Sequence, residues 1–264
     1  MNSFTSAKSK VRELNLTLLR NRIPPPWKYF GLPSTSMEDV ELLKDSLSCV
    51  HAVERGIEGR EWKVQHNLAV TAILKGYRGF KLFRGDIDEI ILESHDQGKQ
   101  MLDWPYDLVN LDYTGGIIYK NSPLNRVKSI QKVVEEQGNR ETSFVLLITV
   151  NDKHYDEGEI SKVIKELGKE CGALVSPETL GEIDRREDRR FAIFIYTTYV
   201  VITTGRRWFR VEPLKPIFYF GTGEYKMLNM SFYLEALQNR DAPAQGTKIL
   251  CKAMAYEPIE VEKL

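Results

Sequence analysis

Cysteine and histidine are scarce in this chain of 264 residues, which contains three cysteines and four histidines. The cysteines, Cys49, Cys171 and Cys251, are odd in number, far apart and without CxxC spacing, so the sequence predicts neither a disulfide framework nor a zinc site. The histidines are scattered without metal-ligand spacing, and we expect no bound metal. The first residues lack the apolar core of a signal peptide, so a cytoplasmic location is the expectation.

An excess of charge of one sign is also absent, because 37 basic and 37 acidic residues cancel. No global field therefore draws the protein to nucleic acid or to an anionic membrane. The longest apolar stretch, residues 191–203, is shorter than the roughly 20 residues that a membrane span needs, and we expect it in the core as a helix or a strand. No GxSxG, P-loop or HExxH motif occurs, which disfavours hydrolase and phosphate-transfer functions.

What the sequence does contain is a regular alternation of short apolar runs and amphipathic segments. The apolar runs predict strands at 28–32, 49–54, 80–84, 106–112 and 144–150, and helical spacing follows each, at 37–47, 62–73, from 88 onward, 126–137 and 160–171. Residues 216–221 and 227–234 predict an antiparallel hairpin, and the chain beyond 239 a loop and a terminal strand. We therefore predict an α/β fold with a Rossmann-like, doubly wound, mostly parallel sheet and a C-terminal antiparallel hairpin.

Acidic residues end three successive predicted strands. The segment 106–116 is an apolar run that stops on Asp112 and Tyr113, while Glu54 and Asp86 follow the second and third strands. Open α/β sheets bind ligands beyond the carboxyl ends of their strands, so these side chains are predicted to face one pocket. A carboxylate after strand two can accept hydrogen bonds from both ribose hydroxyls of a nucleotide. A carboxylate after strand three can accept from an adenine amine, and one after strand four faces the reacting group.

Each of these residues also has a structural interpretation. Glu54 can pair with Arg55 or Arg60 at the surface, and Asp86 can cap the next helix. Strands often end in Asp and Gly because both residues suit turns. Taken singly, each acid is better explained as structural, so the functional interpretation depends on their joint placement.

This layout resembles the class I S-adenosylmethionine-dependent methyltransferases over residues 27–235. The resemblance implies that Glu54 binds the ribose of the cofactor, S-adenosylmethionine, and that Asp86 and Ile87 lie on its adenine side. It also implies that Asp112 and Tyr113 are the catalytic residues. The terminal hairpin separates this family's sheet from that of a dehydrogenase. The implied activity is methyl transfer, with a nitrogen of nucleic acid or protein as the candidate acceptor.

The loop after the first strand departs from the family pattern. Family members carry a Gly-x-Gly-x-Gly-like loop, whereas residues 31–36 contain the single glycine Gly31 and then three small hydroxyl residues that begin at Ser34. Gly31 and Ser34 are the candidate residues for the methionine part of the cofactor, through hydroxyls and helix N-terminal amides. The loop equally fits a helix cap in a methyltransferase-like protein that no longer catalyses and serves as a binding or assembly module. A nicotinamide-dependent enzyme is disfavoured because GxGxxG is absent.

Three arginines, Arg206, Arg207 and Arg210, surround Trp208 and Phe209. Arginines interleaved with aromatic residues can bind phosphates and stack on bases, so nucleic acid is a candidate partner. The preceding arginines, at 185–190, alternate with acids and are more typical of a solvated helix face. The sequence predicts no membrane partner and leaves the oligomeric state open.

We divide the chain into an N-terminal helical lead-in (1–26), a methyltransferase-like domain (27–240) and a C-terminal tail packed on that domain (241–264). The prolines at 24–26 forbid continuation of the helix predicted over 5–20.

Overall fold

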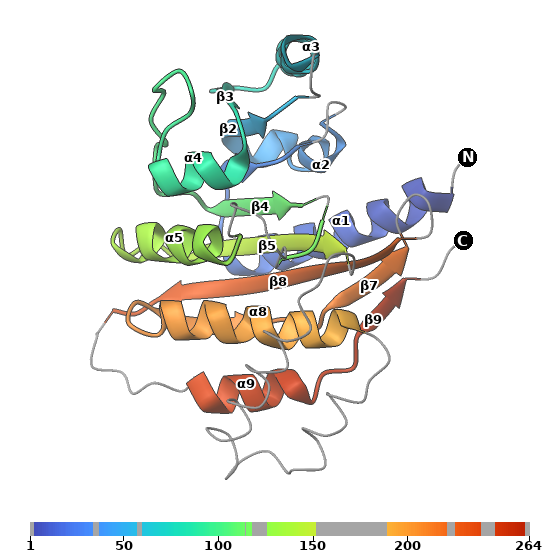
Figure 1. Ribbon diagram of the computed structural model, residues 1–264, viewed down its shortest axis with the longest axis vertical. Helices are drawn as coiled ribbons and strands as arrows, with labels where there is room; N and C mark the ends of the chain where they lie inside the picture. The colour runs from blue at the N-terminus through green and yellow to red at the C-terminus, as the bar shows by residue number, and fades with distance from the viewer. Residues whose placement is uncertain are drawn as a thin grey trace.

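The computed structural model describes residues 3–33, 37–56, 60–113, 115–117, 126–151, 189–220, 225–238 and 246–261. Within these ranges nine strands form one sheet in the order β3-β2-β1-β4-β5-β8-β7-β9, and β6 pairs with β8 (Figure 1). The strands are β1 (Trp27–Gly31), β2 (Leu47–Glu54), β3 (Lys81–Arg84), β4 (Leu108–Asp112), β5 (Phe144–Asn151), β6 (Phe209–Pro213), β7 (Ile217–Phe220), β8 (Lys226–Ala236) and β9 (Ile259–Val261).

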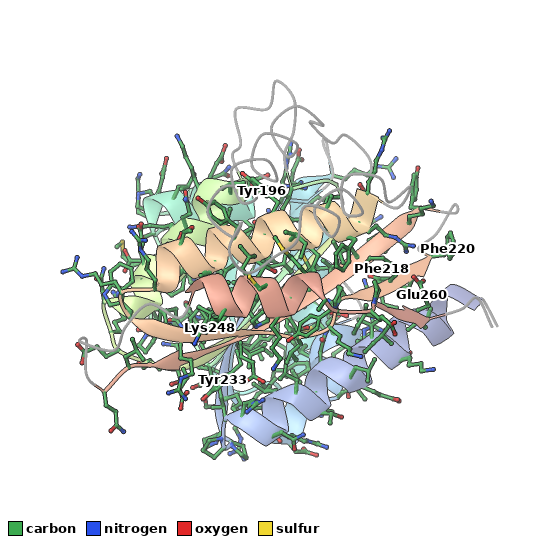
Figure 2. The ribbon with its side chains drawn as sticks, turned by 90° about the horizontal axis from the view of Figure 1, so that it is seen from below. Tyr196, Phe218, Phe220, Tyr233, Lys248 and Glu260 are labelled. Carbon is green, nitrogen blue, oxygen red and sulfur yellow. The ribbon has the colours of Figure 1, made fainter. Side chains whose placement is uncertain are left out.

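Helices cover both faces of this sheet. They are α1 (Ser3–Arg22), α2 (Glu38–Glu41), α3 (Glu61–Leu74), α4 (Ile87–Glu93), α5 (Arg126–Gly138), α8 (Arg189–Gly205) and α9 (Gly246–Met254), with a 3-10 turn at Lys44–Ser46. In Figure 1, α4, α5 and α8 lie in front of the sheet, and α1 crosses behind it. Figure 2 shows α8 and α9 on one side of the strands and α1 on the other.

Strands β3, β2, β1, β4 and β5 are mutually parallel, whereas β8 is antiparallel to β5, β6 and β7. The order reverses between β1 and β4, because β2 and β3 extend the sheet one way and β4 and β5 the other. Both the doubly wound parallel part and the C-terminal antiparallel hairpin of the predicted fold are confirmed.

Alternation along the strands builds two separate cores. Leu108 of β4 and Leu147 of β5 belong to a cluster on the side of α1, α2 and α3. Leu111 and Ile148, on the same strands, belong to a larger cluster on the side of α4, α5 and α8. Successive strand residues point to opposite faces, so nearly continuous apolar runs are needed to fill both cores.

Two elements differ from the prediction, and a third settles a segment that the sequence left open as helix or strand. The stretch 191–203 lies in α8, which is buried almost all round between β8, α5 and α9, so burial rather than β propensity decides its conformation. The helix predicted over 37–47 is reduced to α2 and a 3-10 turn, because Leu47 pairs with Trp27 and starts β2. The tail contains α9 before its terminal strand β9, which makes part of the predicted loop helical.

Two predicted features, the helix over 160–171 and the hairpin turn at 221–224, lie outside the described residues. The lead-in and the tail both contact the sheet: α1 packs on β7 and β8, and β9 pairs with β7. The domain boundaries themselves stay a prediction.

Candidate functional site

The carboxyl ends of the parallel strands meet at one edge of the sheet, where the strand order reverses between β1 and β4. Gly31 lies beside Ala52 of β2 and Asn110 of β4, and Glu54 lies beside Arg84 at the end of β3. Such a reversal is where open α/β sheets bind ligands. The four predicted strand-end positions thus share an edge, and the question is what each side chain does there.

Gly31 is required by the close approach of two strands. A Cβ atom at this position would lie 2.3 Å from the carbonyl oxygen of Asn110. The next residue, Leu32, donates its backbone N–H to that same oxygen at 3.2 Å. Packing against β4 therefore explains this glycine without a ligand. Ser34, the other candidate for the methionine part, lies outside the described residues.

Glu54 stabilises the turn that follows β2. Its Oε1 accepts a hydrogen bond from the backbone N–H of Gly56 at 2.7 Å, and Gly56 has a φ of +85° that favours glycine. Among the described residues none donates a hydrogen bond to Oε2 of Glu54. The predicted surface pairing with Arg55 is absent from the described contacts, because that arginine lies 3.7 Å from Asp86 instead. One carboxylate oxygen of Glu54 thus remains for another donor.

Asp86 caps α4, as its structural interpretation predicts. Its Oδ1 accepts from the backbone N–H of Asp88 at 2.9 Å, and its Oδ2 faces the guanidinium of Arg55. Ile87 is 5% exposed and packs in the larger core. Asp86 also lines a groove at the ends of β2 and β3, which we call the outer groove; it is lined by Arg55, Glu61, Trp62, Gln65, Arg84, Gly85, Asp86, Glu89 and Gln97.

Asp112 points toward α1. Its Oδ2 lies 2.9 Å from the Nζ of Lys8, and the two side chains are 19% and 22% exposed. Burial raises the pKa of Asp112 despite the opposing effect of Lys8. Burial works against the charge of Lys8, but the carboxylates of Asp112 and Asp39 outweigh it and raise the pKa of that lysine. The helix predicted as a lead-in therefore supplies the partner of the predicted catalytic carboxylate.

A cavity lies between α1 and the sheet, and Asp112 lines it; we call it the α1 cavity. The lining residues are Lys8, Val11, Arg12, Asn15, Leu16, Leu19, Tyr29, Asp39, Leu42, Leu43, Leu108, Asn110, Asp112, Leu147, Thr149, Tyr219 and Asn229. The polar strand residues are hydrogen-bonded in pairs. Asn110 donates to the hydroxyl of Tyr29 at 3.2 Å, and Asn229 donates to that of Thr149 at 2.9 Å.

Arg12 closes one side of this cavity by contacting two neighbouring acids. Its Nε lies 2.5 Å from Oδ1 of Asp39, and its NH1 lies 3.0 Å from Oε2 of Glu38. Sequence reasoning missed Lys8, Arg12 and Asp39. A weak signal existed for the cavity, because polar residues such as Asn229 interrupt otherwise apolar strands on one face.

Tyr113 lies on the opposite side of the sheet from Asp112. Its hydroxyl donates to Oδ1 of Asp88 at 2.9 Å, and the guanidinium of Arg126 lies 4.3 Å from the centre of its ring. Asp88 is 2% exposed, and burial raises the pKa of its carboxyl. The structure therefore separates the two predicted catalytic side chains: Asp112 lines the α1 cavity, and Tyr113 joins a buried cluster with α4 and α5.

The arginines predicted to bind nucleic acid lie at the opposite end of the strands, near the amino end of β5. Arg206 and Arg207 follow α8, and Arg210 in β6 pairs with Glu235 at 3.2 Å. Arg210 is paired with Glu235 of β8, which lies six residues from Asn229, the β8 residue at the level of Thr149 and Asp112, or roughly 20 Å along the strand. This surface and the α1 cavity are thus separate places on the molecule.

Among the described residues, no group of three or more His, Cys, Asp and Glu side chains is arranged to hold a metal ion. No described helix combines the length and the apolar character that crossing a membrane requires.

Comparisons with known proteins give similarity to solved structures. The chain is 9% identical to magnesium protoporphyrin IX methyltransferase from Synechocystis PCC 6803, covering 89% of this chain and 86% of that one with a TM-score of 0.48. It is 14% identical to the methyltransferase domain of bacterial CtHen1-CN, covering 87% and 99% with a TM-score of 0.47. It is 10% identical to Trm5b from Pyrococcus abyssi, covering 84% of this chain with a TM-score of 0.42.

The chain spans 48% of the length of Trm5b. No family model matches the sequence, and no curated protein does. The assignment of the fold rests on the strand order.

Proposed function

We propose that this protein is an S-adenosylmethionine-dependent methyltransferase whose cofactor lies along the carboxyl edge of β1, β2 and β3. One observation carries the proposal: Glu54 and Asp112 end β2 and β4, and Asp86 follows β3, so the three acids lie at the carboxyl ends of successive strands on the two sides of the point where the strand order reverses. Each acid has a structural contact. The contacts of Glu54 and Asp112 each use one carboxylate oxygen, whereas Asp86 uses Oδ1 for Asp88 and Oδ2 for Arg55.

The residues at this edge fit the nucleoside part of the cofactor. Glu54 offers Oε2 to the ribose hydroxyls while Oε1 holds the turn at Gly56. The outer groove beside Asp86 contains Trp62, a side chain that is 71% exposed and offers an aromatic face to a base. Gly31 and Ser34 stay candidates for the methionine part.

When bound, S-adenosylmethionine supplies a methyl group made electrophilic by its sulfonium. Asp112 accepts a hydrogen bond from the acceptor group and orients it, and α1 limits the access of water to this carboxylate, whose side chain is 19% exposed. The raised pKa of Asp112 makes it a better proton acceptor than an exposed carboxylate. Tyr113 supports the site from the opposite face by fixing Asp88 at the start of α4.

Calorimetric titration with S-adenosylhomocysteine, the demethylated product, tests the proposal. We expect micromolar binding that weakens at least 10-fold in Glu54→Gln, because the amide keeps the contact with Gly56 but loses the charge that strengthens hydrogen bonds from ribose. Glu235→Gln, an equal loss of charge at the opposite end of the strands, serves as the control and should bind normally. No binding at millimolar ligand would contradict the proposal.

A second candidate function is a methyltransferase-like binding or assembly module without catalysis. The observation that favours it is the ion pair between Lys8 and Asp112, which engages the predicted catalytic carboxylate. The titration above separates the two functions, because this module would bind no cofactor. Nucleic acid as a partner of Arg206, Arg207 and Arg210 stays a separate proposal, and so does the cytoplasmic location.

A further inference from the structure

Asp39 carries a buried oxygen that lacks a partner. Its side chain is 8% exposed, and Oδ1 is held by Arg12. Oδ2 has no hydrogen bond from any described residue, although it is shielded from solvent. A buried carboxylate oxygen without a donor has lost its hydration without compensation, so this atom marks a place where a hydrogen-bond donor belongs. Asp39 lines the α1 cavity, which can supply the room for that donor.

The unpaired oxygen of Asp39 favours a cationic donor. Of the charged residues that line the cavity, Lys8 lies against Asp112 and Arg12 lies against Oδ1 of Asp39, so neither cation donates to Oδ2. A carboxylate oxygen binds a charged donor more strongly than a neutral one, because charge-assisted hydrogen bonds are roughly twice as strong. An ammonium group would therefore satisfy Oδ2 of Asp39 better than a hydroxyl group.

The cavity is apolar at one end and polar at the other. Leu108 and Leu147 line it toward the amino ends of β4 and β5, and Asp112 and Thr149 line it toward the carboxyl ends. Leu19 of α1 adds to the apolar end. A ligand that matches this gradient has a short hydrocarbon body and one polar head.

We propose that the α1 cavity binds an alkyl amine as its ammonium ion, with the head between Asp39 and Asp112 and the hydrocarbon body against Leu108 and Leu147. The role of this amine rests on the proposed function: it is the methyl acceptor. The ammonium first releases a proton to Asp112. The nitrogen lone pair then forms the new N–C bond while the S–C bond breaks and its electron pair stays on sulfur.

Binding to the full chain without cofactor tests this inference, and n-butylamine at neutral pH is the probe. An NMR titration should show saturable binding of n-butylammonium, with n-butanol and butyrate at least 10-fold weaker because each lacks the positive head. Asp39→Asn should weaken n-butylammonium binding at least 10-fold, because it removes the charge at Oδ2. Equal binding of n-butanol, or no saturable binding of the amine, would overturn the inference.

A matched variant separates the cavity from the attachment of α1. Glu38→Gln weakens the other carboxylate contact of Arg12 but leaves the cavity lining intact, because Glu38 is not part of it. Binding should be unchanged in this variant. If Glu38→Gln reduced binding as much as Asp39→Asn, the loss would come from a displaced helix and the inference would fail.

A further probe, Nα-acetyl-lysine amide, distinguishes two sources of the same chemistry. Weaker binding than n-butylammonium assigns the ammonium to a small molecule, and tighter binding assigns it to a protein side chain. Amine binding without any binding of S-adenosylhomocysteine would remove the proposed function and leave an amine site. Cofactor binding without amine binding would remove only this inference.

Discussion

Mutating both partners of the ion pair between Lys8 and Asp112 measures how much the predicted catalytic carboxylate contributes to the stability of the fold. Its two atoms lie 2.9 Å apart, and it joins α1 to the end of β4 across 104 residues of sequence. Asp112→Asn leaves Lys8 without its counter-charge, and Lys8→Met leaves Asp112 without its own. The double variant removes both charges and should be destabilised by less than the sum of the two single changes.

The expected size follows from the exposure of the pair. Two unit charges 4 Å apart attract by roughly 4 kcal/mol at an effective dielectric constant of about 20. Desolvation cancels much of this, and exposed pairs retain about 0.2–1 kcal/mol. Because each side chain of the pair keeps about a fifth of its surface exposed, 22% and 19%, we expect a coupling free energy of about 1–2 kcal/mol. Each single variant should lose about 2 kcal/mol of the free energy of unfolding.

Urea denaturation of the four proteins gives this coupling as a double-mutant cycle. Tryptophan fluorescence is a suitable signal, because Trp27 is fully buried and donates its indole N–H to the carbonyl of Ile23, just beyond α1. Single effects that add within about 0.5 kcal/mol would refute the reasoning and show that the pair contributes nothing to the attachment of α1.

Two further predictions concern residues around the sheet. Gly31→Ala should destabilise the protein by about 2 kcal/mol in urea denaturation without any ligand, since its Cβ would overlap the backbone of Asn110. Gly205→Ala should change stability by less than about 1 kcal/mol, because its Cβ would meet only side-chain atoms, the nearest of them a methyl group of Val134 at 3.3 Å, which can move by a few tenths of an ångström; equal effects would contradict the packing role. His51 has its pKa lowered to about 4 by burial, so the unfolded chain binds its proton first as pH falls. Up to about 3 kcal/mol of stability should be lost between pH 6.5 and 4, and none further below. His51→Asn should remove this step, and an unchanged pH profile would argue against a buried neutral histidine.

The strands and most helices of the sheet could be predicted because local pattern and final environment agree there. Residues 144–150 are apolar without interruption, and both faces of β5 are buried. The prediction had to leave residues 191–203 open, since a β-branched run that is buried all round carries no periodicity. The prediction placed Leu47 in a helix, whereas this residue begins β2. Its pairing with Trp27 of the neighbouring strand is a tertiary contact, which the spacing of apolar residues does not encode.

In the candidate site too, local contacts could be predicted from the sequence and long-range contacts could not. Sequence placed Glu54 and Asp86 at strand ends, and their local contacts with Gly56 and Asp88 are those that turn and cap chemistry predicts. Sequence could not name Lys8 as a partner of Asp112, because that contact depends on where α1 crosses the sheet. Charge pairing across more than a hundred residues is fixed by packing rather than by local pattern.

The opposite orientations of Asp112 and Tyr113 could have been predicted from the sequence, because the two residues are consecutive in an extended segment. Consecutive residues of an extended strand point to opposite faces, so two neighbours at the end of β4 cannot both line one cavity beneath α1. Any acceptor that uses Asp112 must approach on the side of α1 and share that carboxylate with Lys8. If the proposed function holds, α1 is therefore a wall of the acceptor site, and a truncation that removes it would change acceptor binding as well as stability.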